Sequence, residues 1–236
     1  MMKHLPNLIT LANLFCGSIA VIYAVEENFE YAGLFVVLGI FFDFFDGLAA
    51  RLLRVTGELG KQLDSLADMV TSGVVPGIIM FKLIQINLEA NGNIFIFENP
   101  ILDVALIGFF LTLAACLRLA KFNIDDRQST SFIGLPTPAM SLFVVSLPLI
   151  QQYSDVAFAK ELISNNYVLI AITWILSYLM NSEIALFSLK FKDYSIKNNF
   201  IKYLFLIISL LLIWIIPFLS IPIIIILYII FSLIKK

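Results

Sequence analysis

The stretch DFFDGLAARLLRVTGELGKQLDSLAD, residues 43–68, places four aspartates inside two of the most apolar parts of the chain. A carboxylate at bilayer depth costs roughly 2.5–3.5 kcal/mol on insertion scales, so four of them need a compensating charge. On a first helix, two acids share a stripe about 100° wide with two small residues: Asp43, Asp46, Gly47 and Ala50. On the next helix, a stripe about 80° wide holds the other two acids and a glycine: Gly60, Asp64 and Asp68. Facing each other, the stripes would form an all-oxygen cage for divalent cations beside a phosphate.

The composition predicts an all-α integral membrane protein. Of the 236 residues, 61% are hydrophobic and only 14% are charged, and the apolar segments leave no room for a separate soluble domain. The only histidine is His4, so a general base within the membrane must be a carboxylate or a lysine. We expect bilayer lipids around the chain and no nucleic-acid partner.

Eight apolar segments predict about eight transmembrane helices. They cover approximately residues 7–25, 31–54, 59–86, 101–122, 136–152, 166–189, 200–217 and 220–234. We expect six helices around a cavity in a catalytic membrane domain (1–199), followed by a C-terminal transmembrane hairpin (200–236). Pro217 and Pro222 are expected to bracket the turn of that hairpin.

The basic residues predict the orientation. Of the 15 lysines and arginines, all except Lys82 and Lys160 lie at alternate connections: Lys3; Arg51, Arg54 and Lys61; Arg118, Lys121 and Arg127; Lys190, Lys192, Lys197 and Lys202; Lys235 and Lys236. Positively charged connections stay on the cytoplasmic side. We therefore expect both termini and the mouth of the aspartate cage to be cytoplasmic, in the cell (inner) membrane.

Two other interpretations of the aspartates compete with a metal cage. They could be structural partners of three nearby cations, Arg51, Arg54 and Lys61, although these sit near the membrane surface. They could also line the path of a divalent-cation carrier, since intramembrane carboxylates often mark ion pathways. Against a carrier, no matching acidic cluster leads to the opposite side.

The spacing of residues 43–68 resembles the signature of the CDP-alcohol phosphotransferases: two aspartates, Gly, Ala and Arg, then Gly and two aspartates. Four further stretches resemble the integral-membrane phosphatidylserine synthases of that family: PNLITLANLFCG (6–17), LDSLAD (63–68), RLAKFN (118–123) and FIGLPTPA (132–139). The chain departs from the expected pattern at Gln62, at Thr71-Ser72-Gly73 and at Lys121. These positions lie outside the eight-residue signature.

The resemblance implies transfer of a phosphatidyl group from CDP-diacylglycerol to the hydroxyl of L-serine, with release of CMP. It implies two divalent ions, Mg²⁺ or Mn²⁺, held by Asp43, Asp46 and Asp64, with Asp68 as shared ligand and catalytic general base. It also implies a homodimer. Another acceptor alcohol, glycerol 3-phosphate or inositol phosphate, is the alternative within the family, as is an archaeal-type ether lipid donor.

Substrate contacts are expected from residues flanking the acids. Small residues would let the nucleotide lie against the helix backbones: Gly47, Ala50, Gly57 and Gly60. Arg51 offers a fixed fork to phosphate. Polar residues of the first segment, Asn7, Thr10 and Asn13, could hydrogen-bond the nucleoside or merely pair between helices. Serine brings a carboxylate, for which Arg118 and Lys121 are the predicted partners.

Overall fold

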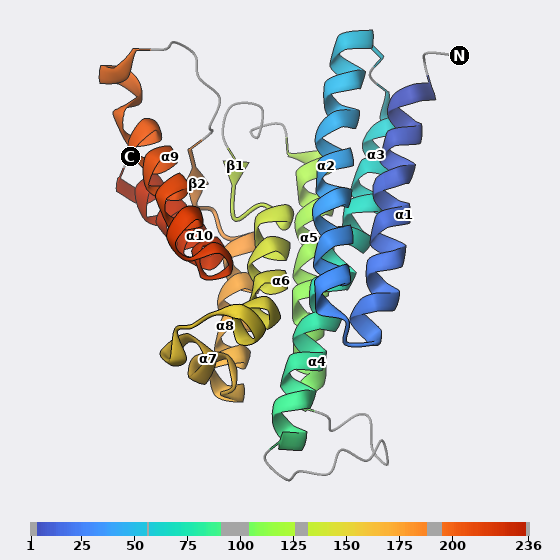
Figure 1. Cartoon of the computed structure of the whole chain (residues 1–236). Helices are drawn as coiled ribbons and strands as arrows, with labels where there is room; N and C mark the ends of the chain where they lie inside the picture. The colour runs from blue at the N-terminus through green and yellow to red at the C-terminus, as the bar shows by residue number, and fades with distance from the viewer. Residues whose placement is uncertain (1–3, 56, 91–103, 126–131, 188–194, 235–236) are drawn as a thin grey trace.

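The structure, a computed structural model, describes residues 4–55, 57–90, 104–125, 132–187 and 195–234 as a bundle of helices (Figure 1). The helices are α1 (Leu5–Val25), α2 (Phe29–Leu53), α3 (Glu58–Asp68), α4 (Val75–Ala90), α5 (Phe110–Ile124), α6 (Thr137–Tyr153), α7 (Ala157–Ile163), α8 (Asn166–Asn181), α9 (Ile196–Ile215) and α10 (Pro217–Ile234). A π-helical segment, η2 (Met69–Val74), joins α3 to α4, and a 3₁₀ segment, η4 (Val104–Phe109), leads into α5. Two residues of β1 (Phe132–Ile133) pair antiparallel with β2 (Ala185–Leu186). The all-α prediction is confirmed.

Helices α1 and α2 pack along each other, α1 also packs against α3, and both contact η2 (Figure 1). Small buried residues on α1 and α2 let the backbones approach closely: Ala20, Ala24, Ala32 and Gly33. At the end of α2, Arg54 adopts a left-handed conformation (φ 52°, ψ 39°). Such a residue ends a helix and turns the chain, and here the next helix begins at Glu58. The turn brings the two aspartate-bearing helices side by side.

The stretch Glu58–Ala90 is the central span of the bundle, running without interruption from α3 through η2 into α4. Its apolar side chains form the core together with those of α5, α6 and α8. The largest of these fully buried side chains include Ile79, Met80, Ile84, Leu111, Met140 and Leu169. The core therefore lies beside and beyond the aspartates along the bundle, and it fixes the helices that carry them.

Five helices of the described chain are long and apolar enough to cross a membrane: Leu5–Val25, Phe29–Leu53, Glu58–Ala90, Val104–Ile124 and Pro217–Ile234. The pair α7 and α8, bent by 77°, raises this to six if it is counted as one span. The chain is therefore a multi-pass membrane protein. The predicted count of eight is not confirmed, because α6 has 17 residues and the apolar part of α9, Asn199–Ile215, is also short.

The C-terminal helices α9 and α10 pack on each other, and α10 packs against α6 (Figure 1). The chain turns at Ile216, and α10 begins at Pro217. The expectation that Pro222 brackets this turn is wrong, since Pro222 lies inside α10. A kink with non-helical backbone at Asn199 interrupts α9, and the expected domain boundary between 199 and 200 falls there.

The predicted orientation depends partly on basic residues outside the described ranges: Lys3, Arg127, Lys190, Lys192, Lys235 and Lys236. Within the described ranges, the start of α1, the end of α2, the start of α3 and the end of α5 meet at one end of the bundle (Figure 1). Arg51, Lys61 and Lys121 lie there. The basic end of the bundle is therefore also the end nearest the aspartates.

Candidate active site

Three of the four predicted aspartates form a compact carboxylate group. Single oxygens of Asp43 and Asp46 on α2 and of Asp64 on α3 all lie within 4.8 Å of one another. Asp68, one turn further along α3 and 9% exposed, interacts electrostatically with the other three. The two predicted stripes therefore do face each other across α2 and α3.

The aspartates have no basic partner among the residues that the structure places. The ion pair seen there joins Lys82 to Glu27, at 2.9 Å. Arg51 donates from Nε to the carbonyl oxygen of Gly47 at 2.9 Å, and Lys61 donates to the carbonyl oxygen of Asn123. The interpretation of the acids as structural ion-pair partners is therefore unsupported. Four neighbouring carboxylates without a cation form an oxygen donor set suited to hard divalent ions.

Polar residues of α1 hold two of these carboxylates. The hydroxyl of Thr10 donates to Oδ2 of Asp46 at 2.5 Å. The amide of Asn13 donates from Nδ2 to Oδ1 of Asp68 at 3.2 Å, and its Oδ1 accepts from the hydroxyl of Thr71 at 2.8 Å. The side chains of α1 therefore hydrogen-bond directly to the aspartates of α2 and α3.

Thr71, in η2, was not among the predicted site residues. Its hydroxyl is fully buried. The sequence offered two signals, a hydroxyl within an apolar span and the departure from the family pattern at Thr71-Ser72-Gly73. Glycines of two helices make room for it: an added Cβ at Gly17 would collide with its Oγ1, and one at Gly39 would lie 2.7 Å from its Cγ2. Single π-helical turns often occur at functional sites, and here the turn brings Thr71 to Asn13.

A cavity of about 250 Å³, which we call the donor pocket, opens beside the carboxylates. It is lined by Pro6, Asn7, Thr10, Asp46, Gly47, Ala50, Val55, Gly57, Gly60, Lys61 and Asp64. Six of the eight predicted nucleotide residues are among them. Arg51 is exposed and outside the lining, and Asn13 is fully buried between Asp68 and Thr71. Neither side chain lines the donor pocket, and Asn13 takes the other role considered for it, pairing between helices.

The glycines of the donor pocket leave space that the protein itself does not fill. An added Cβ at Gly57 would meet nothing within 4 Å. At Gly47 the nearest atom would be Nη2 of Arg51, at 3.9 Å, and at Gly60 it would be Oδ1 of Asn7, at 3.5 Å. Unlike Gly17 and Gly39, these glycines are not required by helix packing. The open space beside the acids fits a bound ligand.

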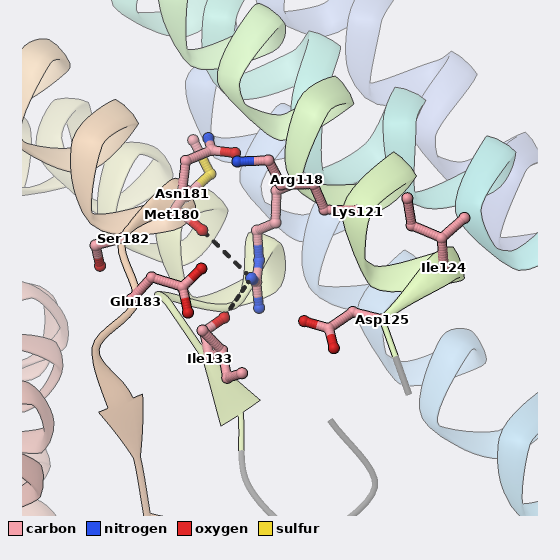
Figure 2. A pocket seen from close by; sticks show the side chains of 9 residues that line it. All are labelled: Arg118, Lys121, Ile124, Asp125, Ile133, Met180, Asn181, Ser182 and Glu183. Atoms are coloured by element: carbon pink, nitrogen blue, oxygen red, sulfur yellow. Dashed lines mark hydrogen bonds between the residues drawn. The ribbon is translucent and has the colours of Figure 1, made fainter. Parts of the chain in front are cut away.

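A second cavity, of about 370 Å³, lies at the end of α5 (Figure 2). We call it the acceptor pocket; it is lined by Arg118, Lys121, Ile124, Asp125, Ile133, Met180, Asn181, Ser182 and Glu183. Arg118 is 6% exposed and donates from Nη1 to the carbonyl oxygens of Ile133, at 3.0 Å, and Met180, at 3.4 Å. Both predicted serine-binding residues therefore line one cavity, and Arg118 also ties β1 to the end of α8.

Asn123 bonds the end of α5, which borders the acceptor pocket, to α3, which borders the donor pocket. Its Nδ2 donates to Oγ of Ser65 at 2.9 Å, and its carbonyl oxygen accepts from Lys61, which lines the donor pocket. The flanking residues Lys121 and Asp125 line the acceptor pocket. The end of α5 is therefore fixed against the helix that carries Asp64.

The sequence matches the CDP-alcohol phosphatidyltransferase family over residues 3–179. The chain is 34% identical to a CDP-diacylglycerol–serine O-phosphatidyltransferase of Bacillus subtilis over 184 residues, covering 78% of this chain and 89% of that protein. It is 30% identical to a Helicobacter pylori protein of the same name over 233 residues, covering 98% and 90%. An archaetidylserine synthase of Methanothermobacter thermautotrophicus is 27% identical over 172 residues, covering 71% and 67%. The match extends from α1 into α8 and includes the whole donor pocket and the α5 side of the acceptor pocket. This chain belongs to the CDP-alcohol phosphatidyltransferase family.

Proposed function

We propose that the protein transfers the phosphatidyl group of CDP-diacylglycerol to the hydroxyl of L-serine, giving phosphatidylserine and CMP. The observation that carries the proposal is the carboxylate group of Asp43, Asp46 and Asp64 beside a glycine-lined pocket. Family membership supports the reaction type, and the names of the B. subtilis and H. pylori relatives support serine as the acceptor. Family membership also favours phosphotransfer over the carriage of cations.

The donor set fits two divalent ions. Asp43, Asp46 and Asp64 would hold them, with Asp68 as a shared ligand, and all-carboxylate ligation suits Mg²⁺ or Mn²⁺. Bound there, the ions would neutralise the pyrophosphate and stabilise charge on the transferring phosphoryl group.

The residues of the chain supply positioning and proton transfer. The open faces of Gly47, Gly57 and Gly60 receive the nucleotide. Asp68 accepts the proton of the serine hydroxyl, whose oxygen forms the new bond to the β-phosphorus of the donor, on the diacylglycerol side. The bond from that phosphorus to the bridging oxygen breaks, and the electron pair leaves with CMP. A carboxylate is a weak base for an alcohol, so its contribution depends on positioning.

The acceptor binds beside the end of α5. Arg118 and Lys121 attract the carboxylate of serine, while Asn123 keeps their helix against the metal-binding helix. The acyl chains enter sideways from the inner leaflet, since a diacyl substrate cannot leave the bilayer cheaply. We further propose a homodimer in the cell (inner) membrane, with both termini and the active site cytoplasmic.

Membranes that contain the protein test this proposal. Labelled serine should enter lipid only when CDP-diacylglycerol and Mg²⁺ or Mn²⁺ are both present. Glycerol 3-phosphate and inositol phosphate, assayed side by side, should react poorly. Efficient use of either one in place of serine would contradict the acceptor assignment. Metal flux into vesicles without any transfer would favour a carrier instead.

A further inference from the structure

We infer that Asp125 and Glu183 form an ammonium-binding subsite in the acceptor pocket, which selects an amino acid over other alcohols. The inference rests on the proposed function and adds a specificity determinant to it. The two acids come from different elements: Asp125 follows α5 and Glu183 follows α8. Figure 2 shows their carboxyl groups pointing toward the guanidinium of Arg118 from opposite sides.

The charges of the acceptor pocket match those of a zwitterion. Two cations, Arg118 and Lys121, line the same cavity as the two acids. Serine carries one carboxylate and one ammonium group. Its carboxylate would meet the two cations of the pocket, and its ammonium group would meet the two acids. A phosphorylated alcohol brings only negative charge, which the two acids would repel. The lining therefore favours an amino-acid acceptor and disfavours glycerol 3-phosphate or inositol phosphate.

Arg118 gives the subsite a fixed geometry. The guanidinium is buried and hydrogen-bonded to the carbonyl oxygens of Ile133 and Met180. These two bonds fix its position in the pocket. A guanidinium offers five donors, and the bonds seen here come from Nη1. A carboxylate ligand can therefore approach Arg118 while its ammonium group lies against the acids.

The acids have the capacity to bind an ammonium group. Both also interact with other groups in the protein. An ionised carboxylate has about four acceptor positions, so it can hold more than one partner at a time. Asp125 is half-buried and Glu183 is exposed at the pocket edge, where a soluble substrate can reach them. Charge-assisted hydrogen bonds of this kind are the stronger ones.

The subsite lies at the end of α5 that is bonded to α3, the helix that carries Asp64 and Asp68. Asn123, two residues before Asp125, hydrogen-bonds Ser65, and Ser65 follows Asp64 in α3. Lys61, which lines the donor pocket, bonds the carbonyl oxygen of the same Asn123. A zwitterion held at the end of α5 is therefore close to the helix that carries the metal-binding and proton-accepting aspartates.

The test compares two acceptors in purified protein supplied with CDP-diacylglycerol and Mn²⁺. L-serine has both charged groups, whereas 3-hydroxypropionate lacks the ammonium group. Glu183→Gln and Asp125→Asn should each lower kcat/KM for serine about tenfold or more, because a charge-assisted bond is lost. Each should leave the rate with 3-hydroxypropionate within about twofold, so the ratio between acceptors narrows. Glu161→Gln is the control, because Glu161 lies at the far end of the bundle and lines neither the donor nor the acceptor pocket. It should change neither rate.

The rates with the two acceptors decide whether Asp125 and Glu183 bind the ammonium group. A purely structural role for the acids would lower both rates equally, and an unchanged ratio in both variants would overturn the subsite while serine transfer by the wild type remained. Wild-type protein that uses glycerol 3-phosphate and not serine would overturn the proposed function, and the subsite with it. Thermal unfolding of each variant shows that it is folded, and two variants from different elements guard against the failure of one.

Discussion

Asn13 of α1 donates a hydrogen bond to Asp68, which lies 55 positions later in the chain, at an Nδ2–Oδ1 distance of 3.2 Å. Thr71 holds the other end of the same amide at 2.8 Å, which directs its Nδ2 toward the carboxylate. Asn13 is fully buried and outside the lining of the donor pocket. It is therefore a positioning residue for the proposed base.

Replacing Asn13 by leucine should lower kcat about 10- to 100-fold, because a hydrogen bond to a charged group contributes about 1.5–3 kcal/mol. KM for CDP-diacylglycerol should stay within about twofold. Steady-state kinetics separates the two parameters. Ser18→Ala, on an exposed part of the same helix, is the control and should behave as wild type. A large rise in KM with an unchanged kcat would instead place Asn13 against the nucleotide.

Removal of divalent ions should abolish transfer, and re-addition of Mn²⁺ should restore it. Asp64→Asn should weaken Mn²⁺ binding about tenfold or more, because it deletes one charged ligand from a group whose oxygens lie within 4.8 Å. Electron paramagnetic resonance of free Mn²⁺ measures this binding without reference to activity. Glu58→Gln, on the same helix but outside the carboxylate group, should bind Mn²⁺ as the wild type does. Equal binding by Asp64→Asn and wild type would remove Asp64 from the metal site.

The glycines divide into two classes that stability measurements should separate. An alanine at Gly17 collides with Thr71, and overpacking of this kind costs about 1–3 kcal/mol, so Tm should fall. An alanine at Gly47 or Gly60 meets no protein atom closer than 3.5 Å, and Tm should hold or rise slightly because alanine favours the helix. Those two variants should instead raise KM for CDP-diacylglycerol. A stable Gly60→Ala protein with normal KM would show that the nucleotide does not use this space.

The pairing of α2 with α3 could be predicted from the sequence because it depends on local rules. Helical periodicity placed Asp43 beside Asp46 and Asp64 beside Asp68, and the short connection between the helices made the two pairs neighbours. Open glycines at matching positions pointed to the donor pocket. These features need no knowledge of distant contacts.

The remaining features depend on tertiary contacts that periodicity does not encode. Thr71, in the π-helical turn, fits only because Gly17 and Gly39 on two other helices leave room for its side chain. The backbone partners of Arg118 come from segments 15 and 62 positions away. Pro222 was expected at a turn, yet it is accommodated within α10, as membrane helices often tolerate proline. The predicted count of eight spans is not confirmed within the described residues, because hydropathy alone does not distinguish long helices from short or bent ones.

Arg118 should prove to have two roles, and comparison with Lys121 separates them. Arg118→Ala leaves the carbonyl oxygens of Ile133 and Met180 without their donor. An unsatisfied buried acceptor costs about 1–3 kcal/mol, so Tm should fall by several degrees while KM for serine rises. Lys121 is exposed, so Lys121→Ala should raise KM for serine at an unchanged Tm.

The pair of measurements discriminates between binding and scaffolding. If Arg118→Ala lowers Tm but leaves KM for serine unchanged, the guanidinium is wholly engaged in joining β1 to α8, and the serine carboxylate must be bound by Lys121. If KM rises at an unchanged Tm, the two carbonyl oxygens have found other donors and the charge of Arg118 serves the substrate alone. The combined effect is expected because a single buried guanidinium has enough donors to hold the backbone and a carboxylate together.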